Sequence, residues 1–482
     1  MRYKLKLATA YLCLSSLSPV SFANNDLPEI GTVGAGALTI EKEKQYGWAF
    51  NMIANQALPI IRDPVLNHYI SELGQDIVSH SDSVKLPFKF FLVEDEDINA
   101  AAFLGGNVKI NTGLFLYAET ESELASVIAH EVAHITQRHL ARMLEQQALS
   151  NPTSIAGLAG SILLALVSPA AGLAALSTTV AVNIQSQINY TRSHEYEADR
   201  IGIQTLANAG FDPYGMADFF GKLAEKYKYA SLPPQMLSTH PLPEARLSEA
   251  RLRASRLKKT HIKNSLNYHL SKARITVRFH RLTAPTLINQ YQSQLQNHKY
   301  QFKKAAEYGL ALAYFKNEKF EQAEKINNQL INDDPNNLFF IDLAADISLA
   351  TKHVQQAIDS LTSYEYRFPS NEVILLNLVV ALKQDKQYAI ADKKIEYFLR
   401  SHPDHILGHL LAIDLYKRMH EKAKEFAMRA EYLALLGRFK EASEKMSSAL
   451  AYTEKKLDQA RYSAKIEEFK RDDIRLKALQ DE

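Results

Sequence analysis

The sequence predicts a mostly helical α+β protein, in which a mixed N-terminal half is followed by an α-solenoid. Between residues 25 and 260, helical periodicity surrounds two strand-like stretches, FKFFLV at 88–93 and NVKIN at 107–111, the second after the turn signal Gly105-Gly106. From about residue 300 onward, alanine, leucine and tyrosine recur at helical spacing, with no proline inside a helical run. We therefore expect a small sheet in the first half and helices alone in the second.

The composition excludes several classes of protein. The 482 residues are 46% hydrophobic and 23% charged, which is typical of a globular chain long enough for several domains. Lys and Arg number 56 and Asp and Glu 54, so we expect no strong attraction to nucleic acid. The single cysteine, Cys13, excludes an intramolecular disulfide framework and a cysteine-based zinc finger.

Residues 1–23 have the layout of a secretory signal peptide, with a basic start, an apolar middle and small residues before a cleavage site after Ala23. A short membrane anchor is the alternative, although three serines interrupt the apolar run. Cleavage would remove three of the 56 basic residues, leaving 53 against 54 acidic residues, and would also remove Cys13. We therefore expect an exported, near-neutral protein without a thiol, which suits an oxidising compartment.

A 34-residue repeat organises the C-terminal half. Each unit carries a proline, an alanine and a bulky apolar residue at fixed positions, and these are Pro335, Pro369 and Pro403; Ala323, Ala357 and Ala391; and Phe320, Val354 and Tyr388. A small residue lets two helices approach and a proline ends a helix, which together are typical of tetratricopeptide (TPR) repeats. After the third proline the spacing drifts, so we expect three regular units and one or two irregular ones. An ordinary helical bundle is the alternative. A TPR array presents a concave surface that binds peptides or protein segments.

The residues with the clearest chemistry follow a predicted helix start, where Thr120 and Glu123 form a capping box. His130 and His134 are four residues apart, so both imidazoles lie on one helical face and can bind one zinc ion. Glu131 lies in the apolar stripe of the same helix, where an unpartnered carboxylate would be costly. A metal ion and its water offset that cost, so we predict that Glu131 takes a proton from the water.

A second motif, 61 residues after the last of these histidines, supplies a third ligand. Glu195 and Asp199 share a helix face, so Glu195 can bind zinc while Asp199 holds a ligand imidazole from behind. His139 is one residue away from the third histidine of the long zinc-protease pattern and is expected to face away, so it is rejected as a ligand. Glu197 and His194 are expected to be surface groups.

These motifs resemble those of the zinc peptidase family that includes HtpX and the CAAX prenyl proteases. The resemblance rests on HEVAH at 130–134 and EYEAD at 195–199, and it extends to NA at 99–100, TGL at 112–114, STHP at 238–241 and Arg246. It implies a gluzincin-type zinc protease domain with a small sheet at 24–260. A helical connector at 261–300 and the TPR domain at 301–482 would follow.

The resemblance also implies roles for single residues. It gives three zinc ligands and a general base, which are His130, His134, Glu195 and Glu131. It implies that His240 occupies the fourth zinc position and keeps the enzyme latent, and that Arg246 stabilises the oxyanion of the intermediate. A structured surface loop is the alternative for both. Strand 107–111 is implied to be a sheet edge onto which an extended substrate adds.

Together with the signal peptide and the repeats, the resemblance implies a periplasmic zinc metalloendopeptidase with one zinc ion per chain. Its clients would be outer-membrane beta-barrel proteins and their assembly machinery, recruited by the TPR array, and it would degrade misassembled ones. The alternative is a protein that acts mainly as a TPR-based assembly factor with a latent, rarely used protease activity. Neither function involves nucleic acid.

The charge pattern of two further stretches predicts their surroundings. No charged residue occurs from Gln146 to Thr191, and Pro169 divides the apolar run into pieces of about 14 residues, too short to span a bilayer core of about 30 Å. For residues 150–185 we expect a helical hairpin lying on a membrane surface or on a partner, with burial in the protein's own core as the alternative. The basic stretch 251–278 is expected to be a solvated helix face, with contact to anionic lipid as a weaker alternative.

Overall fold

The computed structural model describes residues 38–150, 192–228, 235–242, 244–257 and 265–481. The expected signal peptide and the apolar stretch after Ser150 lie outside these residues. Residues 38–257, the N-terminal half, contain all the strands described, and residues 266–481 form a helical array. The predicted division into a mixed α+β half and a helical half is therefore confirmed.

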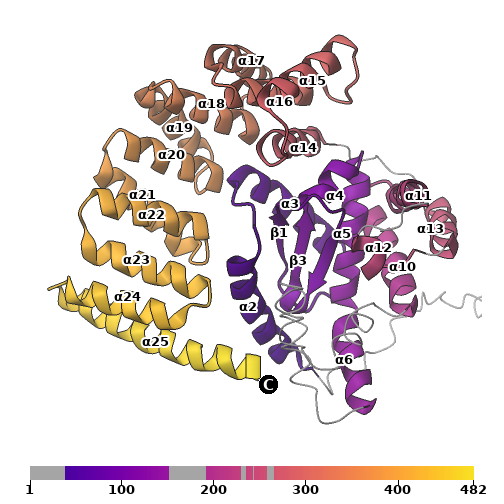
Figure 1. Cartoon of the computed structure of the whole chain (residues 1–482), viewed down its shortest axis with the longest axis horizontal. Helices are drawn as coiled ribbons and strands as arrows, with labels where there is room; N and C mark the ends of the chain where they lie inside the picture. Colours follow the sequence, from indigo (N-terminus) through magenta and orange to yellow (C-terminus); the bar gives the residue numbers. More distant parts are fainter. Residues whose placement is uncertain (1–37, 151–191, 229–234, 243, 258–264, 482) are drawn as a thin grey trace, which may run out of the picture.

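A three-stranded sheet lies at the centre of the N-terminal half (Figure 1). The two predicted strands are β1 (Lys89–Val93) and β3 (Asn107–Asn111), and a third, β2 (Ala100–Phe103), lies between them in sequence. The spatial order is β1-β3-β2, with β3 parallel to β1 and antiparallel to β2. Strand β3 is thus central and hydrogen-bonded on both sides, so the expectation that residues 107–111 form a sheet edge is wrong.

The turn between β2 and β3 depends on glycine. Residues Leu104–Gly106 form a short 3₁₀ turn, η1, in which Gly105 has φ of 74°. A side chain at Gly105 would also lie 2.5 Å from the Cα of Gly47. Both the backbone conformation and this close approach require glycine, and they seat the turn directly on the helix that contains Gly47.

In the N-terminal half, helices surround the sheet. They are α2 (Ile40–Ala57), α3 (Pro64–Ser79), α4 (Thr112–Tyr117), α5 (Glu121–Thr136), α6 (His139–Ser150), α10 (Arg192–Asn208), α11 (Gly215–Tyr227), α12 (Gln235–Thr239) and α13 (Glu244–Arg256). Every residue of α5 is buried, and this helix packs against α10, α11 and β2. No helix among the residues described is both long and apolar enough to cross a membrane.

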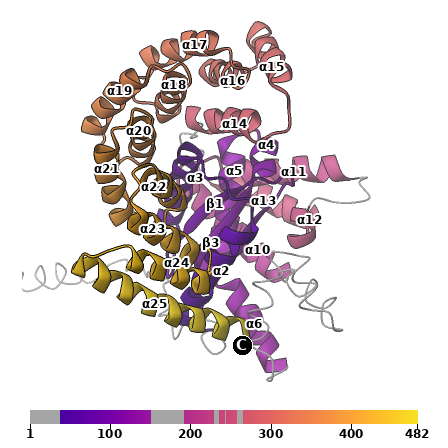
Figure 2. The ribbon, with the colours of Figure 1, turned by 60° about the vertical axis from the view of Figure 1, so that its left-hand side comes forward.

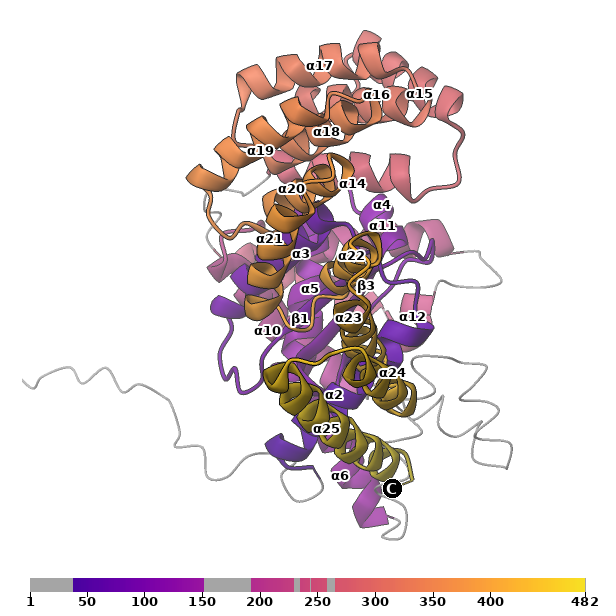
Figure 3. The same cartoon turned by 90° about the vertical axis from the view of Figure 1, so that its left-hand side faces the viewer.

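The array consists of paired helices that curve around the N-terminal half (Figures 1 and 2). They are α14 (Leu266–Arg278), α15 (Ala284–Gln296), α16 (Lys303–Lys316), α17 (Phe320–Asp333), α18 (Leu338–Ala350), α19 (Val354–Arg367), α20 (Glu372–Gln384), α21 (Tyr388–Ser401), α22 (Ile406–Arg418), α23 (Lys422–Leu435), α24 (Phe439–Ala451) and α25 (Lys456–Asp481). Figure 3 looks onto the outer side of this curve, with the N-terminal half behind it.

The repeat markers have the positions that a TPR pattern predicts. The bulky markers Phe320, Val354 and Tyr388 are the first residues of α17, α19 and α21. The repeated alanines are buried, and each repeated proline lies two residues beyond the end of the same helix. The TPR-like prediction is therefore confirmed, and paired helices continue past the point where the sequence spacing drifts.

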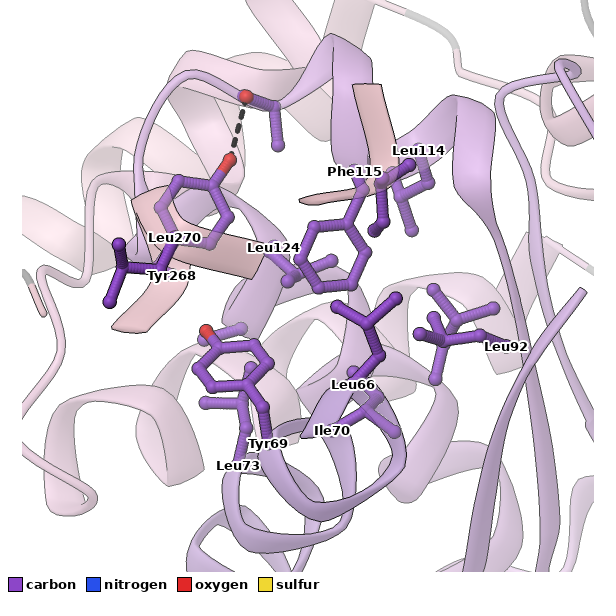
Figure 4. Close-up of a cluster of buried hydrophobic side chains, with 14 of the residues drawn as sticks. Leu66, Tyr69, Ile70, Leu73, Leu92, Leu114, Phe115, Leu124, Tyr268 and Leu270 are labelled. Carbon is purple, nitrogen blue, oxygen red and sulfur yellow. Dashed lines mark hydrogen bonds between the residues drawn. The ribbon is translucent and has the colours of Figure 1, made fainter. Parts of the chain in front are cut away.

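The first helices of the array share a hydrophobic core with the N-terminal half (Figure 4). Leu66 and Ile70 of α3 and Phe115 of α4 lie beside Tyr268 and Leu270 of α14. The hydroxyl of Tyr268 donates a hydrogen bond to the carbonyl of Ala118 at 2.7 Å. A separate core joins α2 to α23, α24 and α25. The array is thus attached at both of its ends.

Candidate metal centre

Helices α5 and α10 bring the two sequence motifs together. The Thr120 hydroxyl accepts a hydrogen bond from the Glu123 amide at 3.2 Å and caps α5 at the predicted residue. Helix α10 lies against α5, and a side chain at Gly202 would lie 3.2 Å from the backbone nitrogen of His130. The missing side chain allows this approach, which places Glu195 of α10 opposite the histidines of α5.

Four side chains converge on one point: His130, His134, Glu195 and His240. The Nε2 of His130 lies 3.0 Å from the Nε2 of His134 and 3.4 Å from the Nδ1 of His240. The Glu195 oxygens lie 3.4 Å from each of the first two nitrogens and 3.1 Å from the third. Ligand atoms about 2.0–2.1 Å from a tetrahedral ion are about 3.3–3.4 Å apart. The group therefore has the dimensions of a metal site with four protein ligands.

Glu131 lies beside this group with no exposed surface. Its carboxylate is 3.5 Å from the Nε2 of His240 and lies near the backbone of Ala102 in β2. Burial raises the pKa of the Glu131 carboxyl, while the charges of His240 and His130 act in the opposite direction. A fully buried carboxylate is costly unless polar or charged groups compensate it, which fits a position beside a metal ion and its water.

A carboxylate and a guanidinium support His130 from behind. The Nδ1 of His130 lies 3.0 Å from Asp199. Arg246 donates two hydrogen bonds to Asp199, at 2.7 and 2.8 Å, and its Nη1 lies 2.8 Å from Glu195. Burial acts to raise the pKa of Asp199, but the hydrogen bonds from Arg246 and His130 lower it below its usual value. Asp199 thus lies against the ring of His130, and Arg246 is buried against Asp199 instead of lying on a surface loop.

The side chains next to His134 differ from the prediction. His139 is outside the ligand group, as predicted, but its ring does not face away: its Nδ1 lies 2.8 Å from the Nδ1 of His134. Its Nε2 lies 3.1 Å from Glu197, and the His194 ring stacks on it at 4.5 Å. Burial and His194 lower the pKa of His139 to about 4. The expectation that His194 is a surface group is wrong, since 4% of it is exposed, whereas the Glu197 side chain stays 26% exposed.

The reason for this difference is a turn that helical periodicity does not predict. Helix α5 ends at Thr136, and α6 begins at His139. Between them Arg138 has φ of 52°, and its guanidinium donates to the carboxylate of Glu43 at 3.1 Å. The change of direction turns the His139 ring toward His134. No sequence pattern predicts the left-handed backbone conformation of Arg138. Helical spacing alone therefore could not predict the contact between His139 and His134.

Comparisons with known proteins agree with this geometry. The model of the family described as "Peptidase family M48" matches residues 64–254, which include α5 and α10. The chain is 42% identical to the putative beta-barrel assembly-enhancing protease of Vibrio cholerae over 95% of both chains. It is 38% identical to the beta-barrel assembly-enhancing protease of Escherichia coli, covering 96% of this chain and 95% of that protein.

A more distant relative is similar over a shorter part of the chain. The mitochondrial metalloendopeptidase OMA1 of Bos taurus is 30% identical over 179 residues, 36% of this chain and 33% of that protein. The likeness to the bacterial proteases, in contrast, runs through the array as well. With this full-length similarity and a buried His-His-Glu-His group that could hold a metal ion, the chain belongs to peptidase family M48, a family of metallopeptidases.

Proposed function

We propose that this protein is a periplasmic zinc metalloendopeptidase that promotes the assembly of outer-membrane beta-barrel proteins and degrades misassembled ones. The near-tetrahedral group of donors from His130, His134, Glu195 and His240 supports the catalytic part of the proposal. The names of the relatives, which are similar over 95% of their length, support the client class. In this proposal residues 24–260 carry the protease, 261–300 connect, and 301–482 recruit clients and assembly machinery.

The donor set favours zinc. Three imidazoles and one carboxylate at these separations match the tetrahedral coordination and nitrogen-rich ligation that zinc accepts. A zinc ion held there would activate a water molecule and polarise the carbonyl of a bound peptide. We therefore expect one zinc ion per chain, bound by His130, His134 and Glu195, with His240 as a fourth ligand in the resting protein.

The chain's own residues then divide the work. Glu131 takes a proton from the attacking water and delivers it to the leaving amine, because it is the carboxylate beside the ligand group that is not itself a ligand. The guanidinium of Arg246 is directed at Asp199, Glu195 and the carbonyl of Pro241. We therefore propose that Arg246 holds Asp199 and Glu195 in position, instead of contacting the oxyanion of the intermediate.

The corrected sheet order changes where an extended substrate would bind. Strand β2 is an edge strand and packs against α5. The outer edge of β1 is partly taken, because the amide of Ile61 donates to the carbonyl of Leu92 at 2.9 Å. We propose that the substrate backbone adds to β2, by the pairing that open sheet edges provide, instead of to β3.

His240 gives the site its latent character. Catalytic zinc sites keep one position open, whereas His240 fills the fourth position and is 4% exposed. Residues that follow α12 must move before a substrate can reach the ligands. This closed arrangement also favours the second candidate function, in which the protein acts mainly as a TPR-based assembly factor and seldom cleaves.

The Glu131→Gln variant tests the proposal. We expect zinc content to stay near one ion per chain, client binding to persist, and peptide cleavage to fall by at least about 10²-fold, because the proton acceptor is lost. Glu72→Gln is the matched control, since Glu72 is on α3 with 63% of its side chain exposed, and it should change none of these quantities. Cleavage that survives in Glu131→Gln contradicts the assigned base.

The same variant separates the two functions. If Glu131→Gln still supports beta-barrel assembly in cells that lack the natural protein, assembly does not require cleavage and the second candidate is favoured. If it supports none, the assembly function depends on proteolysis. Metal analysis of His130→Ala, which removes a ligand, should find no bound zinc.

A further inference from the structure

The two histidines of α5 are supported in different ways. Behind His130 there is a carboxylate, Asp199, at 3.0 Å. Behind His134 there is another imidazole, His139, at 2.8 Å between the two Nδ1 atoms. Metal-binding histidines usually donate their second N–H to a carboxylate, a backbone carbonyl or water, so an imidazole in this position needs an explanation.

Ligation by His134 determines where the protons lie. A metal bound at the Nε2 of His134 leaves the proton of this ring on Nδ1. At 2.8 Å the Nδ1 of His139 is placed to accept that proton's hydrogen bond, which puts the proton of His139 on its Nε2. This Nε2 lies 3.1 Å from an oxygen of Glu197, and a carboxylate is an acceptor only. The three groups therefore form one chain of hydrogen bonds with a single direction, from His134 through His139 to Glu197.

The surroundings hold this chain in place. The ring of His139 has no exposed surface, and His194 stacks on it with 13° between the ring planes. Arg142 donates a hydrogen bond to the same oxygen of Glu197 at 2.8 Å. His194 and Glu197 are on α10, the helix that also supplies Glu195. The helix that contributes the third ligand thus also supports the second one.

We propose that His139, oriented by Glu197, is a positioning residue of the metal centre, which fixes the tautomer and the ring orientation of His134. This inference rests on the proposed metal site and deepens it. Glu197 keeps the acceptor nitrogen of His139 facing His134, just as Arg246 keeps Asp199 facing His130. The two ligand imidazoles are then held by two parallel arrangements, one direct and one relayed through a second imidazole.

The test compares three substitutions of His139 in the full chain lacking residues 1–23. His139→Phe keeps a buried ring of similar size but removes the acceptor, and we expect the Kd for zinc to rise about 10- to 100-fold, the usual effect of losing such a partner. His139→Ala should weaken binding at least as much. His139→Asn places a carbonyl oxygen near the position of the lost Nδ1, so it should recover most of the affinity.

The second measurement is the visible spectrum of the protein loaded with Co²⁺, which reports the geometry of the ligands. We expect the bands of His139→Phe to shift and those of His139→Asn to resemble the wild type. His194→Ala is the packing control: it removes the stacked ring but keeps the acceptor, so its Co²⁺ bands should shift less than those of His139→Phe. Glu197→Gln should lie between the wild type and His139→Phe in zinc affinity.

The measurements separate failure of the positioning role of His139 from failure of the proposed metal site. A wild-type chain that binds no zinc would overturn the metal site itself. Tight zinc binding by the wild type together with equal affinity and an unaltered Co²⁺ spectrum in His139→Phe would overturn only the positioning role. If His139→Phe does not fold, the comparison of His139→Asn with His139→Ala decides: equal zinc affinities in these two variants overturn the proposal.

Discussion

The helical array contacts the N-terminal half through an apolar core at both of its ends, and the polar groups beside the two cores differ. At its start, charged side chains of α3, α14 and α18 form a charged junction, which consists of Asp63, Arg274, Arg278, Asp342 and Asp346. Arg274 is buried, and its guanidinium nitrogens lie 2.8 Å from Asp63 and 2.7 Å from Asp342. Arg278 lies 2.6 Å from Asp346. Asp63, which caps α3, thereby binds the N-terminal half to the array.

At its end, the array meets α2 through an aromatic junction, which consists of Trp48, Met52, Gly437, Phe439 and Arg475. The rings of Trp48 and Phe439 stack with centroids 5.9 Å apart, and the Arg475 guanidinium lies 4.5 Å from the centre of the Trp48 ring. Gly437 has φ of 71°, and a side chain there would lie 3.1 Å from the Cβ of Met52. This contact consists of ring stacking, a cation–π contact and close van der Waals packing.

The difference indicates which end can open. Separating the start of the array would break these ion pairs and would also expose the apolar core that α14 shares with α3 and α4. Separating the aromatic junction exposes apolar area, at about 25 cal/mol per Å². Between the two ends lies a cavity of about 620 Å³, lined by α2, α3 and β1 on one side and by Glu372, residues 404–407 and Leu435 of the array on the other. We therefore expect the array to stay fixed at its start and to move at its end.

The largest expected effect is on the charged junction. Arg274→Ala leaves Asp63 and Asp342 buried without their main partner, so the free energy of unfolding should fall by about 3–5 kcal/mol. Denaturant unfolding of the full chain measures this loss. Arg281→Ala is the matched control. The Arg281 side chain is 94% exposed and its ion pair with Glu96 is long, at 4.0 Å, so the substitution should lower the free energy of unfolding by less than about 1 kcal/mol. Equal effects of the two substitutions would remove the basis of the comparison.

A smaller and local effect is expected at the aromatic junction. Trp48→Ala removes a half-buried ring and its stacking on Phe439, which should cost about 1–3 kcal/mol. Amide hydrogen exchange should become faster in α23–α25 and α2 while that in α14–α18 stays as in the wild type. Trp48→Phe keeps an aromatic ring and should retain most of the protection. Faster exchange throughout the array would mean that both ends open as one unit.

Neither junction was visible in the sequence. Arg274 belongs to the basic stretch that was expected to be a solvated helix face, yet only 1% of it is exposed. Its partner Asp63 is 211 residues away, and nothing in local charge patterning pairs residues at that distance. The order of the sheet was hidden for the same reason: β1 pairs in parallel with β3, while β2, the alanine-rich strand missed from sequence, occupies the far edge.

The metal-binding group, in contrast, could be predicted wherever helical spacing alone decides the geometry. His130 and His134, like Glu195 and Asp199, are pairs four residues apart on single helices, and each pair lies on one face as expected. The position of His240 followed from the resemblance to a family and not from spacing. The orientation of His139 and its contact with Glu197 do not follow from spacing, because the turn at Arg138 interrupts the helical period.

The smallest expected effect concerns the ion pair across the cavity, where Lys89 of β1 lies 2.6 Å from Asp404 of the array. Both side chains are more than half exposed, so Lys89→Ala should change the free energy of unfolding by less than about 1 kcal/mol, and high salt should abolish the difference. The hydrogen bond from Lys89 lowers the pKa of Asp404, against the effect of burial. A carboxyl with a depressed pKa in the folded state stabilises the fold above its unfolded pKa, so this small contribution is present at neutral pH and is lost on acidification.

Combining Lys89→Ala with Trp48→Ala decides what holds the free end of the array. Lys89 and Trp48 both belong to the N-terminal half, and both line the cavity between that half and the array. If the aromatic junction governs closure, hydrogen exchange in α23–α25 of the double variant should match that of Trp48→Ala alone at high salt. If Lys89→Ala by itself opens these helices as far as Trp48→Ala does, the exposed ion pair is the latch. The opening would then depend on ionic strength, because salt screens an exposed ion pair but does not screen an apolar contact.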